Sequence, residues 1–444
     1  MSGRLLPFVA LSLLLTGTLV ANEPMRLQER FPAGYQYHVS SRVRLAGELN
    51  IPADKENPKG QTLSVTGESA IEYDERIVEA GNDEPARTLR VYKRIDFQRK
   101  FGKQEQDNTL RTPVRRLVIL RQNHAEVPFS PDGPLLYTEI DLVRTDVFTP
   151  ALNGLLPSDA VKPGDRWKAN ATAVAELTDL DRIEEGSLEC KFEDVVTVAG
   201  RKHARISLAG NVRGVNEDGP SRYEINGFFY FDLVSNHLSY LSFKGKHLLL
   251  DKDGKANGWN EGTFTLTRQA NVNSPDLSDS VVRGIALEPN ANNTLLLYDN
   301  AELGIKFLYP RRWRIGRVEG RQIMLDDNEN KGNGMLITLA DLKSTPTPQQ
   351  FLDEAQGVLK EQKGRILGTQ PPRPLQSGSF AIDRFTLEAE MVNQRLLLDY
   401  YILRQAVAGA TVFARMLPAD IQALRPEIEQ IARSIVLSTP KPGM

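Results

Sequence analysis

Apolar and polar positions alternate along most of the chain from about residue 34 to residue 269. In the segment 90–101, apolar side chains fall on one face and charged side chains crowd the other. The apolar ones are Val91, Ile95, Phe97 and Phe101. A period of two is typical of half-buried β-strands. Polar turn-forming runs such as 131–133 and 251–254 separate the strand-like segments. The pattern predicts long antiparallel strands in a curved sheet or an incomplete β-barrel, with 171–180 as the only helix of this part.

The alternation stops after residue 270. Turn-forming residues dominate 271–280 and 289–293, and large apolar residues are few there, which is typical of a linker. From residue 294 onward, strand-like runs alternate with two amphipathic segments. The order strands, helix, strands, helix predicts an α+β unit in which helices cover an antiparallel sheet.

Both helices of this second part have readable signals. Thr347 can cap the first helix, Pro348 suits its first position, and Gln350 completes a capping box. The second helix carries an apolar stripe, and we expect Pro426 to break or restart it near Arg425. The stripe consists of Ile421, Leu424, Ile428, Ile431 and Ile435.

The first 21 residues have a different composition from everything that follows. Arg4 precedes an apolar run over 5–15, the small residues 16–21 come next, and the chain turns polar at Asn22. This is the pattern of a secretory signal peptide, which we expect to be cleaved after Ala21. A retained anchor is the alternative. Its 17 residues would span about 25 Å as a helix, against a hydrocarbon core of about 30 Å. We therefore predict an exported protein, periplasmic or extracellular.

These observations divide the chain into four parts. They are a signal peptide (1–21), an antiparallel β-rich domain (28–270), a linker (271–293) and an α+β domain (294–438).

Charge and cysteine content narrow the classes of function. The net charge of −2 argues against a nucleic-acid binder. Cys190 is the single cysteine, so an internal disulfide cannot form. It alternates with Leu188 and Phe192 on one face of a predicted strand, and no basic neighbour favours its thiolate. We interpret Cys190 as a small core residue rather than a reactive thiol.

One local charge bias has two interpretations. The segment 87–121 holds eleven Lys or Arg and three acidic residues. A cationic sheet face could contact an anionic surface such as lipid headgroups or an acidic partner. Alternatively, the segment 176–194, with eight acidic and two basic residues, neutralises it within the domain. We favour the second interpretation.

No catalytic, cofactor-binding or metal-binding residue is predicted, no cofactor is expected, and the ligand-binding residues remain unknown. The chain has no nucleophile elbow and no phosphate-binding glycine loop. The acidic runs 251–258 and 326–334 place Ala256 and Lys331 where a calcium loop requires glycine. The histidines lack the spacing of a metal site, although His237 and His247 could share a sheet face. The five are His38, His124, His203, His237 and His247.

The C-terminal part resembles the PsbP-like superfamily. The resemblance rests on Tyr298-Asp299-Asn300, on the run 304–310 ending in Tyr309-Pro310, on Trp313, and on a final helix ending at 432–436. It implies an α/β/α sandwich that serves as an accessory or partner-binding module, with Tyr309, Pro310 and Trp313 in structural positions. More loosely, Pro163-Gly164-Asp165 followed by Trp167 resembles uncharacterised exported envelope proteins of planctomycete-type bacteria.

Three hypotheses follow for the function. The leading one is a non-catalytic exported envelope protein that binds a protein partner or an envelope component, with its oligomeric state open. The second is a carrier of hydrophobic or lipid ligands on the concave N-terminal sheet. Aromatic residues could line that sheet, although such a stripe is more often the packed inner face of a sheet: Phe228, Phe229, Tyr230, Tyr240 and Phe243. The third is a hydrolase acting on envelope polymers, which requires a cleft with converging titratable groups.

Overall fold

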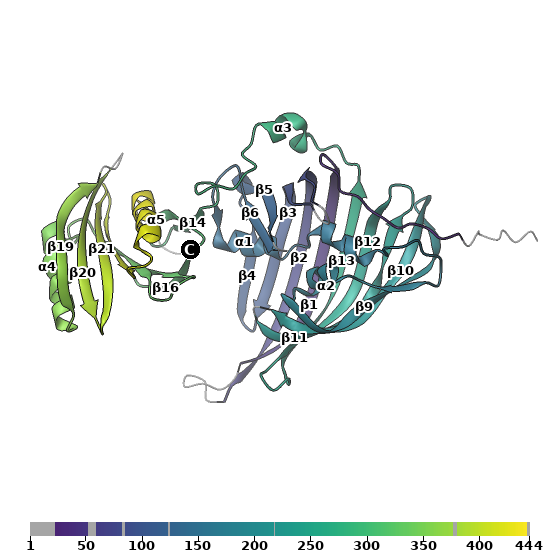
Figure 1. Ribbon diagram of the computed structural model, residues 1–444, viewed down its shortest axis with the longest axis horizontal. Coiled ribbons are helices and arrows are strands. Elements are labelled where there is room, and N and C mark those ends of the chain that lie inside the picture. Colours follow the sequence, from purple (N-terminus) through teal and green to yellow (C-terminus); the bar gives the residue numbers. More distant parts are fainter. Residues whose placement is uncertain are drawn as a thin grey trace, which may run out of the picture.

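The computed structural model describes residues 23–51, 59–81, 85–122, 125–216, 218–375 and 380–441. The predicted signal peptide (1–21) and His124 lie outside the described residues. The chain is mostly β-sheet with few helices and forms two units that lie side by side (Figure 1). In the described part, no helix is long and apolar enough to cross a membrane.

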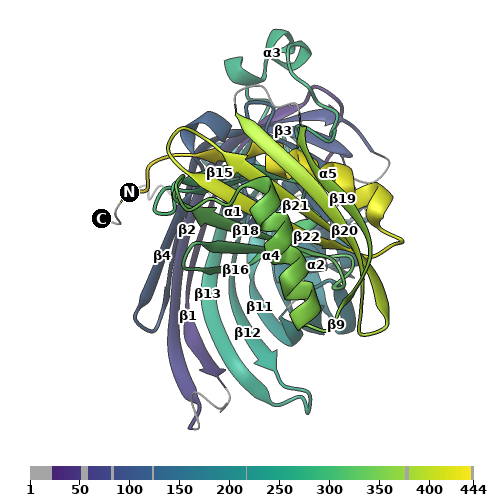
Figure 2. The same cartoon turned by 90° about the vertical axis from the view of Figure 1, so that its left-hand side faces the viewer.

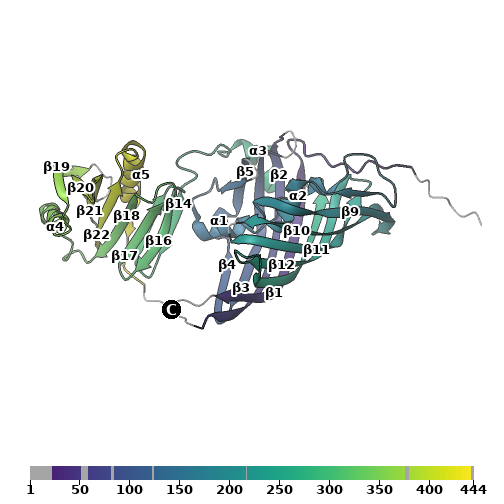
Figure 3. The same cartoon turned by 60° about the horizontal axis from the view of Figure 1, so that its bottom comes forward.

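A twelve-stranded sheet forms the N-terminal unit. Every pairing in it is antiparallel, in the order β6-β5-β3-β2-β1-β13-β12-β11-β10-β9-β8, with β4 paired to β3. Its two ends, β6 and β8, do not pair with each other, so the sheet is not closed into a barrel. Figure 3 shows how it curls from β3 through β13 to β9. The strands are β1 (Gln36–Ile51), β2 (Gln61–Glu79), β3 (Arg87–Phe101), β4 (Gln104–Thr109), β5 (Arg116–Gln122), β6 (Ala125–Phe129), β8 (Arg166–Lys168), β9 (Arg182–Val198), β10 (Arg201–Asn216), β11 (Gly219–Asp232), β12 (His237–Leu250) and β13 (Ala256–Ala270).

Alternation along β11 and β12 separates the aromatic side chains that the carrier hypothesis placed together. Phe229 is fully buried in the core, whereas its neighbours Phe228 and Tyr230 are half-buried and contact each other and Tyr240. Successive side chains of a strand point to opposite faces. These residues therefore do not form one continuous lining, because they lie on both faces of the sheet.

Short helices cover one face of this sheet, seen in front of it in Figure 1. They are α1 (Tyr137–Arg144), the 3₁₀-helix η2 (Thr149–Leu155) and α2 (Ala171–Thr178). α2 begins at Asn170, whose side chain accepts a hydrogen bond from the Ala173 N–H, and it confirms the helix expected over 171–180. α1 was not expected, so the prediction of a single helix here is wrong. Its eight residues are too few to display a helical period.

The segment that joins the two units packs against the opposite face of the sheet. It contains the 3₁₀-helix η3 (Pro275–Leu277) and α3 (Asp279–Arg283). Leu277 is fully buried in a cluster with Leu89, Val118 and Phe129. Arg76 of β2 donates a hydrogen bond of 2.7 Å to the Leu277 carbonyl. Although 271–293 has the composition of a linker, part of this segment packs against the sheet.

A seven-stranded antiparallel sheet organises the C-terminal unit, in the order β16-β17-β18-β22-β21-β20-β19. The helices α4 (Pro348–Glu361) and α5 (Ile421–Ser434) lie on opposite sides of it (Figure 1), and Figure 2 shows α4 crossing the strands. The strands are β16 (Trp313–Glu319), β17 (Gln322–Asp327), β18 (Gly334–Ala340), β19 (Arg365–Leu375), β20 (Ala381–Met391), β21 (Gln394–Arg404) and β22 (Gly409–Met416).

The helix signals of this unit have mixed outcomes. The capping box is confirmed: Thr347 accepts from the Gln350 N–H, and the Gln350 side chain accepts from the Thr347 N–H. The prediction that Pro426 interrupts the last helix is wrong, because α5 runs continuously through it. Proline removes one backbone donor from the helix, while Leu424, Ile428 and other apolar residues of α5 are buried in the core.

A four-stranded sheet joins the two units, in the order β23-β15-β14-β7. β7 (Leu135–Leu136) belongs to the N-terminal unit and pairs in parallel with β14 (Leu296–Asn300) through two residue pairs. β15 (Ile305–Tyr309) and β23 (Val436–Leu437) complete it. Trp313, which follows β15, is 1% exposed, and its indole N–H donates to Glu427 at 2.9 Å.

Candidate functional site

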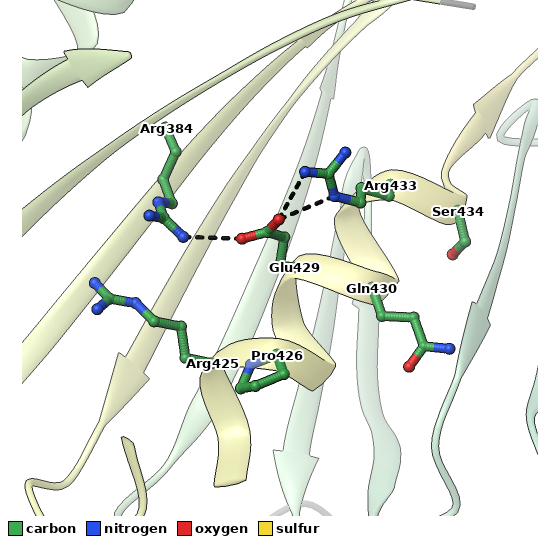
Figure 4. Close-up of a pocket in the computed structure, with 7 residues that line it drawn as sticks. All are labelled: Arg384, Arg425, Pro426, Glu429, Gln430, Arg433 and Ser434. Carbon is green, nitrogen blue, oxygen red and sulfur yellow. Dashed lines mark hydrogen bonds and ion pairs between the residues drawn. The ribbon is translucent and has the colours of Figure 1, made fainter. Parts of the chain in front are cut away.

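An arginine-lined cavity of about 580 Å³ lies between α5 and the seven-stranded sheet (Figure 4). Its lining residues come from β20 and from α5, from Arg425 to the end of the helix. They are Arg384, Arg425, Pro426, Glu429, Gln430, Arg433 and Ser434. We take this cavity as the candidate functional site because cationic side chains converge there.

Strand alternation places a polar row beneath α5. Arg384 and Thr386 of β20 stand opposite Tyr401 and Asp399 of β21 in the antiparallel register. The intervening residues, such as Phe385, point to the other face and pack against α4. The sheet therefore presents an apolar surface to α4 and a partly polar surface to α5.

The helix contributes its own polar row. Arg425, Glu429 and Arg433 are spaced four residues apart, so they lie on one face of α5. Leu424 and Ile428 of the same helix are fully buried and hold that face against the sheet. Figure 4 shows Glu429 between Arg384 and Arg433, with both guanidinium groups directed at its carboxylate.

Ion pairs fix the geometry of the cavity. Arg425 donates two hydrogen bonds of 2.8 Å to the buried carboxylate of Asp399, and a third, of 3.0 Å, to the Thr386 hydroxyl. Hydrogen bonding to Asp399 raises the pKa of Arg425. On the other side of the cavity, Arg384 donates to Glu429 Oε2 at 2.9 Å, and Arg433 donates twice to Oε1 at 2.7 and 3.0 Å.

Three arginines and two carboxylates are the charged side chains of this cluster among the described residues. Arg384, Arg425 and Arg433 carry three positive charges against the two negative charges of Asp399 and Glu429. Glu429 and Arg433 are 26% and 36% exposed, so solvent and a ligand can reach them. The accessible guanidinium groups suit an anion at this place.

The cavity is suited to binding rather than to acid–base chemistry. Guanidinium groups stay protonated at physiological pH and cannot act as general bases. Ser434 engages the backbone, since its hydroxyl lies 2.7 Å from the Ile431 carbonyl and accepts from the Leu308 N–H at 2.9 Å. Tyr401 is fully buried beside Arg384, and burial raises the pKa of its hydroxyl.

The basic segment 87–121 does not form one cationic face. Arg90 and Arg121 are buried within the N-terminal unit. Arg111 pairs with Glu139, and Arg116 pairs with Asp132. From the acidic segment 176–194, Glu176 forms an ion pair with Arg121 of the basic segment, at 3.4 Å.

The remaining sequence candidates serve structural roles. Cys190 is fully buried, and burial raises the pKa of its thiol to about 12. His247 stacks on Tyr223 at 4.1 Å, whereas His237 lies against the Arg268 carbonyl, so these two histidines do not meet. Within the described ranges, no three His, Cys, Asp or Glu side chains are placed to hold a metal ion.

Arg312 and Asn333 bind the carboxylate of Asp327. The acidic loop 326–334 is therefore held together by hydrogen bonds within the protein.

Sequence reasoning missed the arginine cavity. The spacing of Arg425, Glu429 and Arg433 is visible in the sequence and marks a charged helix face. The contribution of Arg384 could not be foreseen, because the pairing of β20 with β21 beneath α5 is a tertiary property. In the sequence, Pro426 is readable only as a helix breaker and not as part of a cavity wall.

Comparisons with known proteins found similar solved structures for part of the chain. No family model matches the chain, and no curated protein matches it. Similar solved structures include the cyanobacterial PsbP (CyanoP) of Synechocystis sp. PCC 6803, with 11% identity, 32% of this chain and 92% of that chain covered, and a TM-score of 0.26.

The Ran-binding protein Mog1p of Saccharomyces cerevisiae matches with 9% identity, 32% and 95% coverage, and a TM-score of 0.26. Lipovitellin matches with 10% identity, 65% of this chain and 29% of that chain covered, and a TM-score of 0.33. The PsbP-like resemblance is thus matched over about a third of the chain, and the resemblance to planctomycete-type envelope proteins finds no support. None of these likenesses carries a functional argument.

Proposed function

We propose that this protein is a non-catalytic, exported binding module that holds an acidic segment of a partner protein in the arginine cavity of its C-terminal unit. The observation that carries the proposal is the convergence of Arg384 and Arg433 on the accessible Glu429, with Arg425 on Asp399 in the same cavity. In this proposal the C-terminal unit is a PsbP-like α/β/α sandwich, and the site of action is the periplasm or the extracellular space.

The binding step follows from the existing ion pairs. Glu429 occupies the position that a ligand carboxylate would take between Arg384 and Arg433. An incoming carboxylate would bind the two guanidinium groups that solvent reaches, those of Arg425 and Arg433, which are 27% and 36% exposed. Hydrogen bonds to charged groups contribute about 1.5–3 kcal/mol each. Losing one such contact therefore weakens binding by roughly 10- to 100-fold.

A direct binding assay tests the proposal. Fluorescein-labelled hexaglutamate is titrated with the full chain at low salt, and its anisotropy is compared with that of hexaglutamine. We expect binding of hexaglutamate alone, weakened by added salt because the contact is ionic. Arg433→Gln should weaken binding about tenfold or more. The matched control is Arg395→Gln, which removes an exposed arginine that pairs with Glu388 at 3.5 Å.

Two outcomes contradict the proposal. One is equal affinity for hexaglutamate and hexaglutamine. The other is an equal loss of affinity in the Arg433 and Arg395 variants, which would reflect general attraction to surface charge. The carrier and hydrolase hypotheses stay predictions, because no observation favours either of them over the binding module.

A further inference from the structure

Six ionisable side chains form a buried cluster between the N-terminal sheet and its helical cover. Four come from the sheet: Glu75 of β2, Arg90 of β3, Arg121 of β5 and Glu126 of β6. The cover contributes Asp146, just after α1, and Glu176 of α2. None of the six side chains is more than 14% exposed, and three of them are fully buried.

Arg90 links the sheet to the cover. It donates to Glu75 at 2.6 Å and to Asp146 at 3.2 Å. Arg121 makes the second link, donating to Glu176 at 3.4 Å. The ring of Phe148 lies beneath both guanidinium groups, at 5.7 Å from Arg90 and 4.3 Å from Arg121.

The cluster contains four carboxylates and two guanidinium groups. Two negative charges would therefore be unmatched if every carboxylate were ionised. Burying unmatched charge costs several kcal/mol per ion, and carboxylates avoid this cost by taking up a proton. Glu126 is the clearest case, because both of its oxygens are buried without a hydrogen-bond partner, and its arginine neighbours lie 3.7 and 3.9 Å away.

The other polar groups around the cluster do not supply the missing positive charge. The hydroxyls of Tyr37, Tyr73 and Tyr92 face it from β1, β2 and β3, and burial raises the pKa of all three. Tyr37 and Thr88 donate hydrogen bonds to Glu75. Thr149 of η2 donates to Tyr37 at 3.2 Å.

From the cover, the backbone N–H groups of Val147 and Phe148 donate to Asp146 and Glu176. Arg144 of α1 is the remaining cation that acts on Glu126.

We propose that this cluster is a proton-operated latch: protons bound by Glu126, Asp146 and Glu176 hold the helical cover, residues 137–178, on the sheet, and their release loosens it. The device is independent of the arginine cavity. Mild acid tightens the cover, and neutral pH relaxes it.

The direction of the pH dependence follows from where the protons bind. Burial raises the pKa of Asp146 to about 7 and that of Glu176 to about 7, and it also raises the pKa of Glu126. An exposed carboxyl group in the opened state titrates near pH 4. Between about pH 4 and pH 7 the closed state therefore binds more protons, so closure weakens as pH rises through this window and is constant above it. The change is up to about tenfold per pH unit for each proton.

Hydrogen exchange measured on the full chain at pH 5 and pH 7.5, corrected for intrinsic exchange rates, tests the latch. We expect the backbone amides of α1, η2 and α2, the helices within 137–178, to lose protection at least tenfold at pH 7.5, while those of the C-terminal sheet do not. Glu126→Gln and Asp146→Asn imitate the protonated side chains and should reduce this difference. The matched control is Asp232→Asn, a buried acid whose pKa is low, at about 2, and which should leave the difference unchanged.

The proposal would be overturned if the protection of these helices in the natural chain did not change with pH. It would also be overturned if Glu126→Gln and Asp146→Asn both kept the full difference in protection between pH 5 and pH 7.5. If the variants fail to fold, infrared spectroscopy of the natural chain decides. A carbonyl band from a protonated buried carboxyl group should be present at pH 5 and absent at pH 8.5. Its absence at pH 5 would refute the latch.

Discussion

A buried ion pair connects the segment before β1 to the N-terminal sheet. Its removal tests how much a paired buried charge contributes to the stability of this unit. Arg268 of β13 is 2% exposed and pairs with Glu29, which is 4% exposed and precedes the first strand. The guanidinium group lies 5.4 Å from the ring of Phe31 and 5.0 Å from that of Tyr37. Glu29 also accepts a hydrogen bond of 3.1 Å from the Leu238 N–H. One carboxylate therefore serves both a buried cation and a backbone donor.

Glu29→Ala should destabilise the N-terminal unit by about 3–5 kcal/mol, because it leaves a guanidinium group buried without a counter-charge. Replacing both partners, as in Glu29→Leu with Arg268→Met, should cost less than Glu29→Ala, because no buried charge is left unpaired and only the Leu238 N–H loses its acceptor. The free energy of unfolding is measured by urea titration, with the fluorescence of Trp167 and Trp259 reporting on this unit.

Comparing the single and double variants shows whether the cost of Glu29→Ala comes from an unpaired buried charge or from lost side-chain packing. A cost below about 1 kcal/mol for Glu29→Ala would mean that solvent reaches Arg268, contrary to its burial. A double variant as unstable as the single one would mean that shape, rather than uncompensated charge, sets the cost. Either result would refute the reasoning.

Three further predictions concern single residues. Thr347→Ala should lower the stability of the C-terminal unit by about 1 kcal/mol in urea titration, because it removes the α4 cap; no loss would contradict the capping box. Asp232 is buried, yet hydrogen bonds from the N–H groups of Ser235 and Val234 hold its pKa at about 2. Its contribution is therefore present above about pH 4 and lost toward pH 2, so Asp232→Asn should destabilise at pH 6 and have little effect near pH 2. Equal effects at both pH values would contradict this. Cys190 should react with a thiol reagent at pH 8 only as fast as the protein unfolds, and rapid stoichiometric labelling of the native protein would contradict its burial.

Local chemistry made some elements predictable from the sequence. The Thr347 capping box and the Asn170 start of α2 depend on side chains within three residues of the helix ends, so the sequence contains the whole signal. The alternation around Cys190 likewise depends on strand geometry alone, and the residue is buried as predicted.

Features that depend on distant partners could not be predicted. Arg90 appeared to belong to a cationic stripe, yet its acidic partners come from β2 and from the segment after α1. Pro426 was judged by its effect on an isolated helix, whereas in the protein the packing of Leu424 and Ile428 keeps α5 continuous. The arginine cavity could not be predicted for both reasons. Its prediction requires knowing which face of α5 packs on the sheet and which residues of β20 lie beneath that face.

The parallel pairing of β7 with β14 has a mechanical consequence. Two residue pairs connect the units there, compared with the thirteen that join β1 to β13. A pulling force applied through a partner in the arginine cavity would load the sheets and this junction in series, and the junction has far fewer residue pairs. In a single-molecule stretching experiment, the first rupture should therefore separate the two units while each stays folded. Separation at the β7–β14 pairing would thus release the force before either large sheet unfolds.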